Sequence, residues 1–126
     1  MKLITHNMLT SKILKNVVTG YPLKIHAVKA ELKKADFQPD FIARMIKKID
    51  YKTLYQAAET LGYAEGMPKT EILNEEDMNN EETLKKLHEV LLEIEVIEGD
   101  LECPETGRKF PINNGIPNML VNEEEL

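Results

Sequence analysis

The sequence predicts an α+β fold, in which both chain ends build a small antiparallel sheet and a helical domain is inserted between them. Two observations lead to this prediction. Apolar and polar residues alternate near each end, as in half-buried strands, whereas apolar residues between 39 and 91 recur every three or four positions, as in helices. We therefore expect residues 1–35 and 92–126 to form the sheet domain, and residues 36–91 the helical domain. With 126 residues, 42% of them hydrophobic, the chain is long enough to bury one core.

The first 35 residues contain one clear strand pattern. Met1–Ile4 is compatible with a short strand, and Asn7–Lys15 with about one helical turn. Leu23–Val28 alternates apolar and polar residues directly after Pro22, which favours an extended chain. In this predicted strand His26 lies on the polar face.

Two helices are predicted next. Pro39 suits the first position of a helix, where the N–H that proline lacks is not needed. Asp50 can cap a second helix over Tyr51–Leu61, and Gly62 suits its end. We expect these helices to pair through two apolar stripes, namely Phe41, Ile42, Met45, Ile46 and Ile49 on the first and Leu54, Tyr55, Ala58 and Leu61 on the second.

A third helix is predicted after an acidic segment. Residues 64–79 lack sustained periodicity and contain Gly, Pro and Asn, which predicts a mobile loop. Asn80 then caps a helix, with Glu81 and Glu82 placed favourably against its positive end. The apolar face of this helix consists of Leu84, Leu87, His88 and Leu91.

The C-terminal part predicts an antiparallel meander. At Leu92 the period changes to two, which predicts a strand that ends in a turn at Gly99–Asp100. Pro117 cannot donate a hydrogen bond to a sheet, so its segment would be an edge strand. Such a strand either pairs with another protein's sheet or is an ordinary terminal strand of this chain. Three short strand-like segments follow the Gly99–Asp100 turn, at 101–103, 108–112 and 116–121.

The charge distribution argues against a free-standing nucleic-acid binder, because the formal net charge is −6. Residues 1–62 carry 11 basic and 5 acidic side chains, whereas residues 63–126 carry 5 and 17. The basic half either lies near a polyanion carried by a partner or is a solvated surface. The single cysteine and the lack of a signal-peptide or membrane-span pattern lead us to expect a soluble intracellular protein.

The sequence contains no recognisable catalytic or cofactor motif. His6, His26 and His88 each lie apart from any nucleophile with an orienting acid. The segment from Cys103 to Gly107 has the layout of a zinc knuckle, with Thr106 in place of the second cysteine. A structural zinc site needs four ligands, so we expect a metal-free turn rather than a site in which distant histidines share Cys103.

Five segments carry a family resemblance: Met1–Asn7, Phe37–Phe41, Leu91–Glu93, Glu98–Gly99 and Phe110–Leu120. They resemble the small eukaryotic subunit that several methyltransferases share. Members of that family are called multifunctional methyltransferase subunit or tRNA methyltransferase activator subunit. The similarity runs along nearly the whole chain.

This resemblance implies a non-catalytic activator and stabilising subunit. Such a protein forms heterodimers with S-adenosylmethionine-dependent catalytic subunits that act on tRNA, 18S ribosomal RNA and a translation termination factor. The partner binds S-adenosylmethionine, RNA meets the chain only through the complex, and no membrane is involved. The implied fold joins a zinc-knuckle-like domain from both chain ends to a central helical domain, and the implied location is the cytoplasm and nucleus.

The resemblance also implies functional positions. Some members bind zinc through four cysteines, and the corresponding residues here are Ser11, Asn16, Cys103 and Thr106, so we expect no zinc. A strand of the activator extends the partner's sheet, with apolar contacts around it. The residues most similar to that partner interface are Met8, Leu9, Phe41, Met45, Ile116, Pro117, Asn118, Met119 and Leu120.

Three alternatives stay open on the sequence. The first is a small RNA-binding module that uses the basic N-terminal half, which would bind RNA with a steep salt dependence. The second is an enzyme built on His88 or on the glutamates of the 93–98 segment. The third is an adaptor unrelated to methyl transfer.

Overall fold

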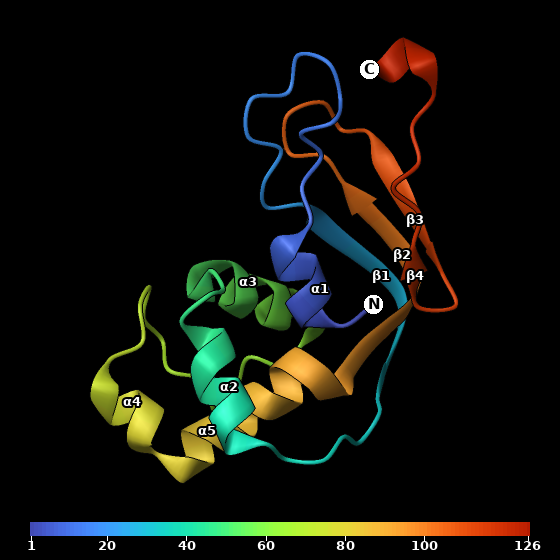
Figure 1. Cartoon of the computed structure of the whole chain (residues 1–126). Coiled ribbons are helices and arrows are strands. Elements are labelled where there is room, and N and C mark those ends of the chain that lie inside the picture. The colour runs from blue at the N-terminus through green and yellow to red at the C-terminus, as the bar shows by residue number, and fades with distance from the viewer.

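A computed structural model describes residues 1–126 and shows a four-stranded antiparallel sheet with the helices gathered beside one part of it (Figure 1). The strand order is β1–β2–β3–β4, so β1 and β4 are the two edges. The sheet combines a strand from the N-terminal part with strands from the C-terminal part, which confirms the predicted α+β fold. The bounds are β1 Lys24–Leu32, β2 Ile94–Glu102, β3 Lys109–Asn113 and β4 Ile116–Pro117.

The second predicted helix has the expected bounds. Asp50 accepts a hydrogen bond from the Thr53 N–H at 3.2 Å, and Gly62 follows the last helical residue. Asn80 caps its helix in the same way.

None of the helices has the length and apolar content that crossing a membrane requires. The helices are α1 Leu3–Met8, α2 Pro39–Ile46, α3 Tyr51–Leu61, α4 Glu75–Asn79 and α5 Glu81–His88, followed by the π-helical turn η1 Glu89–Glu93 and, near the chain end, the 3-10 helix η2 Glu123–Glu125.

The expected pairing of α2 with α3 is wrong. α2 packs mainly against α5, whereas α3 packs against α1, β1 and η1. The connection between α2 and α3 is short, but each helix buries its apolar stripe against a different neighbour. A stripe shows that a helix face is covered and leaves the covering element undetermined.

The first residues form a helix where a strand was predicted. Leu3, His6 and Asn7 are buried at positions three and four apart, which is the spacing of one helical face. Lys2 alone retains strand character, in an isolated bridge to Glu95 of β2. The predicted helical turn over residues 7–15 is also misplaced, because α1 ends at Met8.

The predicted loop at 64–79 contains the short helix α4. Asn74 caps it and exchanges hydrogen bonds with Asp77, as in a capping box. None of its five residues is buried, so it has no apolar stripe that the sequence could reveal.

Strand β2 runs through the predicted turn at Gly99–Asp100. Its register with β1 shifts around Ala27–Ala30, where the two strands form a bulge. A Cβ atom on Gly99 would lie 2.2 Å from the His26 carbonyl oxygen, so only glycine fits this close backbone approach. Gly99 is therefore required by the bulge between β1 and β2, and it does not form a turn.

The last predicted strand is shorter than expected. Only Ile116 and Pro117 pair with β3, opposite Asn113 and Ile112. The Asn118 N–H still donates to the Pro111 carbonyl at 2.8 Å, and the chain leaves the ladder beyond this bond.

A single cluster of 21 buried hydrophobic residues lies beneath both the sheet and the helices. The domain boundaries expected at residues 35 and 92 stay a prediction. Members of the cluster that are fully buried include Ile42, Leu54 and Leu87 from the helices and Leu101, Phe110 and Ile112 from the sheet.

The buried side chain of Asn7 joins α1 to the α2–α3 connection. Its Oδ1 accepts the Asp50 N–H at 2.9 Å, and its Nδ2 donates to the Asp50 carbonyl at 2.8 Å. These two bonds satisfy both backbone groups of the residue that caps α3.

We predict that Asn7→Ala lowers the free energy of unfolding by about 1–3 kcal/mol, because the Asp50 N–H loses its partner and the Asp50 carbonyl keeps only the bond from the Leu54 N–H. Chemical denaturation of the purified chain measures this change. The control is Thr5→Ala, at an exposed position of the same helix. Equal stability of the two variants would contradict the role of Asn7.

Candidate partner-binding surface

The chain from Ile116 to Val121 is extended along the β4 edge. Exposed and half-buried residues alternate along it, with Ile116, Asn118 and Leu120 exposed. This period of two indicates an extended segment with one face against the protein and one face outward. We name residues 116–121 the edge segment.

The outward face of the edge segment is largely apolar. The side chain of Ile116 is 69% exposed and that of Leu120 is 80% exposed. On the inner face, Met119 and Val121 pack against the core cluster. Asn113 and residues 116–120 line an open hollow of about 600 Å³. Apolar side chains on an exposed edge are a feature of protein-binding surfaces.

Arg108 holds the end of the edge segment in place. Its guanidinium donates to both carboxylate oxygens of Glu125, at 2.6 and 3.1 Å, and to the Leu120 carbonyl at 3.3 Å. It also lies over the Phe110 ring, 4.6 Å from the centroid. The hydrogen bond with Arg108 lowers the pKa of the Glu125 carboxyl and raises the pKa of Arg108.

The structure brings together only part of the predicted partner interface. Ile116, Pro117, Asn118, Met119 and Leu120 line one hollow. The other four residues belong to α1, α2 and the residue after α1, and Figure 1 shows α2 and β4 on opposite sides of the view. Of these four, Met8 is exposed, whereas Leu9, Phe41 and Met45 are half-buried.

The free edge of β1 is a second surface, which the sequence analysis missed. Val28 is 80% exposed, and Leu32 at the end of β1 is exposed as well. In the predicted alternation Val28 falls on the polar face, together with Lys24 and His26. An apolar residue on this polar face was the sequence signal that could have indicated an exposed apolar surface on β1. The bulge and several charged side chains make this edge a poor template for strand pairing.

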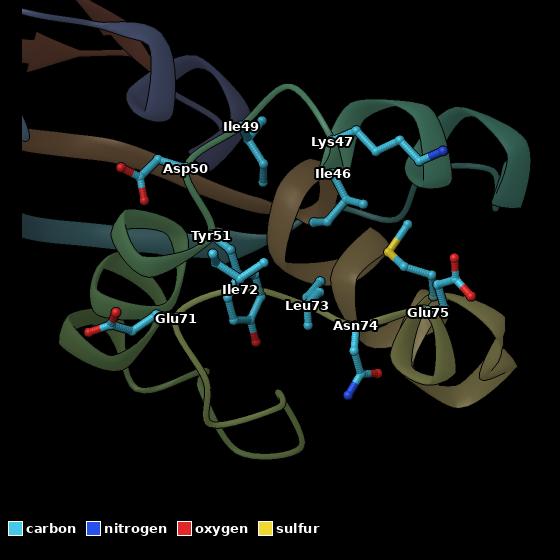
Figure 2. Close-up of a pocket in the computed structure, with 11 residues that line it drawn as sticks. Ile46, Lys47, Ile49, Asp50, Tyr51, Glu71, Ile72, Leu73, Asn74 and Glu75 are labelled. Atoms are coloured by element: carbon cyan, nitrogen blue, oxygen red, sulfur yellow. The ribbon is translucent and has the colours of Figure 1, made fainter.

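A hollow of about 440 Å³ lies between the α2–α3 connection and residues 71–78 (Figure 2). Its lining is apolar at Ile46, Ile49 and Leu73, with charged side chains such as Glu71 around it. The sequence analysis missed it because its second wall lies in the segment expected to be a loop. Its lining suits an apolar side chain better than a reacting group.

The three histidines are separate and hydrogen-bonded within the fold. His6 Nε2 lies 2.7 Å from the Leu23 carbonyl, and burial lowers the pKa of His6. His88 Nε2 lies 2.9 Å from the Ala35 carbonyl. His26 is exposed on the polar face of β1, as predicted.

The glutamates of the 93–98 segment also have structural contacts. Glu93 accepts the Ala35 N–H at 2.9 Å. Glu95 accepts a hydrogen bond from the Met1 amino group at 3.0 Å. No group of three or more His, Cys, Asp or Glu side chains is placed to hold a metal ion.

The residues at the four zinc-ligand positions do not fit zinc. Burial raises the pKa of the Cys103 thiol, but hydrogen bonds from the Ser11 and Thr106 hydroxyls and from backbone N–H groups outweigh it and lower the pKa. Asn16 is exposed. One thiol, two hydroxyls and a solvent-facing amide do not make the tetrahedral Cys/His set that structural zinc requires.

The turn that follows Cys103 carries a carboxylate with unusual partners. Glu105 accepts hydrogen bonds from the N–H groups of Val18, Thr19 and Gly20. The bonds from Val18 and Gly20 contribute most to holding the pKa of the Glu105 carboxyl below its usual range. The sequence offered no signal for these contacts, because about 85 residues separate the partners.

Comparisons with known proteins agree with this fold. A family model described as Trm112p-like protein matches residues 2–115. The chain is 50% identical over 129 residues to the Arabidopsis thaliana protein "Multifunctional methyltransferase subunit TRM112 homolog A", with 100% of both chains covered. It is 48% identical over 126 residues to the Mus musculus "Multifunctional methyltransferase subunit TRM112-like protein", with 99% and 98% covered.

A solved structure has a similar fold. The match is a chain of the E. cuniculi Mtq2–Trm112 complex, which is described as responsible for methylation of the eRF1 translation termination factor. The TM-score is 0.54 at 24% identity, and 95% of each chain is covered. With a family model over most of its length and full-length relatives at about half identity, this chain belongs to the Trm112p-like family.

Proposed function

We propose that the chain is a non-catalytic activator and stabilising subunit that forms heterodimers with S-adenosylmethionine-dependent methyltransferases. Its full-length relatives are named multifunctional methyltransferase subunits. The observation that carries the proposal is the edge segment, which places Ile116 and Leu120 outward beside the edge strand β4. The substrates we assign to the complexes are tRNA, 18S ribosomal RNA and a translation termination factor, in the cytoplasm and nucleus.

The edge segment supports sheet extension as the mode of binding. Residues 119–121 donate no ladder hydrogen bond to β3. The Leu120 N–H donates to Asn118 Oδ1 and the Leu120 carbonyl accepts from Arg108, whereas the N–H groups of Met119 and Val121 are open to a strand of the partner. The outward side chains Ile116 and Leu120 would lie against apolar side chains of that partner. Main-chain bonds then provide affinity, and the outward side chains provide specificity.

Activation follows from mass action on the partner's folded state. A catalytic subunit with an open sheet edge and an apolar patch aggregates on its own. Binding of the chain covers both features and stabilises only the folded form, by an amount that grows with the free concentration of the chain relative to the Kd. The catalytic subunit binds S-adenosylmethionine and performs the chemistry.

We predict that Leu120→Asp weakens binding to the methyltransferase subunits that co-purify with the tagged wild-type chain at least about tenfold, which corresponds to about 1.4 kcal/mol. The carboxylate would lose water in an apolar contact without gaining a partner. Affinity is measured by titration with one purified subunit.

Val28→Asp is the matched control, because Val28 and Leu120 are both 80% exposed and lie on opposite edges of the sheet. We expect wild-type affinity from this control and unchanged thermal unfolding from both variants. Wild-type binding by Leu120→Asp would contradict the assigned surface. Loss of binding by Val28→Asp alone would place the interface on β1.

A second prediction concerns the partner's stability. Added to a purified catalytic subunit, the chain should raise that subunit's unfolding free energy by about 2.7 kcal/mol at a free concentration one hundred times the Kd. A thermal-shift titration measures this rise, which should continue logarithmically with concentration. A midpoint that does not move while methyl transfer increases would contradict stabilisation as the mechanism.

A further inference from the structure

The Glu105 carboxylate joins two loops of the chain. These loops contain the four positions at which, by the family resemblance, some members have zinc-binding cysteines. One loop spans residues 11–20 and contains Ser11 and Asn16, and the other is the Cys103–Gly107 turn. Glu105 of the turn accepts the N–H groups of Val18 and Thr19, both at 3.0 Å, and of Gly20 at 2.6 Å. The Thr19 hydroxyl lies 3.4 Å from the same carboxylate.

Three successive N–H groups that converge on one anion form a backbone nest. The nest depends on Gly20, which has a left-handed φ of 59°. A Cβ atom there would lie 2.7 Å from Ser11 Oγ and 2.8 Å from Lys12 N, so no larger residue fits. The Ser11 N–H also donates to the Gly20 carbonyl at 2.9 Å, which closes the loop behind the nest.

The loop in turn holds the end of the chain. The Lys15 N–H donates to the Glu125 carbonyl at 2.7 Å. The Glu125 carboxylate pairs with Arg108, which also donates to the Leu120 carbonyl. The contact between Glu105 and the nest is thus continuous with the contacts that hold the C-terminal residues against the sheet.

The zinc-ligand positions cannot connect the loops through a metal ion, because they hold one thiol, Cys103, two hydroxyls and an exposed amide. We propose that the Glu105 carboxylate, bound in the nest of Val18, Thr19 and Gly20, holds the two loops together in place of a metal ion. Glu105 is a positioning residue, and the fold of this region is independent of zinc.

The first test uses the purified full chain without a partner, so its outcome is independent of the proposed function. Glu105→Ala should lower the thermal midpoint by at least about 3 °C and speed amide exchange at Val18, Thr19 and Gly20 at least about tenfold. Glu65→Ala is the matched control, because Glu65 is also an exposed glutamate in a turn and forms no hydrogen bond or ion pair. It should behave like the wild type.

Rescue by a free carboxylate shows whether Glu105→Ala acts by emptying the nest or by a general loss of stability. Added sodium formate should restore slow exchange at the three amides in Glu105→Ala and change nothing in Glu65→Ala. Glu105→Gln, which keeps the shape and loses the charge, should give an intermediate effect, and it serves in place of the alanine variant should that variant fail to fold. Wild-type midpoint and exchange in both Glu105 variants would overturn the proposal.

The second test concerns the metal directly. Zinc chloride and a chelator should each leave the thermal midpoint of the wild-type chain unchanged. A variant with Ser11→Cys, Asn16→Cys and Thr106→Cys should bind one zinc ion per chain, and in its zinc-bound form Glu105→Ala should no longer lower the midpoint. A chelator that lowers the wild-type midpoint would overturn the proposal, as would undiminished loss from Glu105→Ala in the zinc-bound variant.

Discussion

The antiparallel pairing of β1 with β2 is the interaction on which the rest of the structure depends. It joins Lys24–Leu32 to Ile94–Glu102, and thereby closes a loop that contains α2, α3, α4 and α5. The entropic cost of closing such a loop rises only slowly with its length. The 21-residue hydrophobic cluster, which draws on both the strands and the enclosed helices, offsets this cost. The helices and the sheet therefore stabilise each other.

The strand order β1–β2–β3–β4 leaves β1 and β4 at the edges of the sheet, and these two edges differ in their side chains and backbone. The β1 edge carries a bulge and charged side chains, which protect it from pairing with other proteins. The β4 edge continues into the edge segment, where apolar side chains alternate outward and the backbone leaves the ladder. One sheet thus has a protected edge and a more open edge, which is the arrangement that the proposed binding through a single edge needs.

At the end of the sheet beside the Cys103–Gly107 turn, hydrogen bonds join the two loops that contain the positions that the family resemblance associates with zinc. A zinc ion joins two loops through four strong bonds. Here several weaker contacts converge on the same loops, including the Glu105 nest and the Lys15–Glu125 bond. Such contacts involve backbone groups, so apart from the requirement for glycine at position 20 they depend little on neighbouring side chains.

Local signals determined much of this protein from sequence alone. The bounds of α3 and the Asn80 cap follow from capping and periodicity, and β3 lies within one residue of the predicted strand at 108–112. Residues 116–120, which line the hollow of the edge segment, were named as part of a partner interface from the resemblance to a known family, and their role in binding stays a prediction. Only the tertiary structure decided that α2 covers α5, that Gly99 serves a bulge and that Glu105 reaches a distant loop. The physical reason is that each of these features depends on a neighbour far away in the chain, which no local pattern of residues encodes.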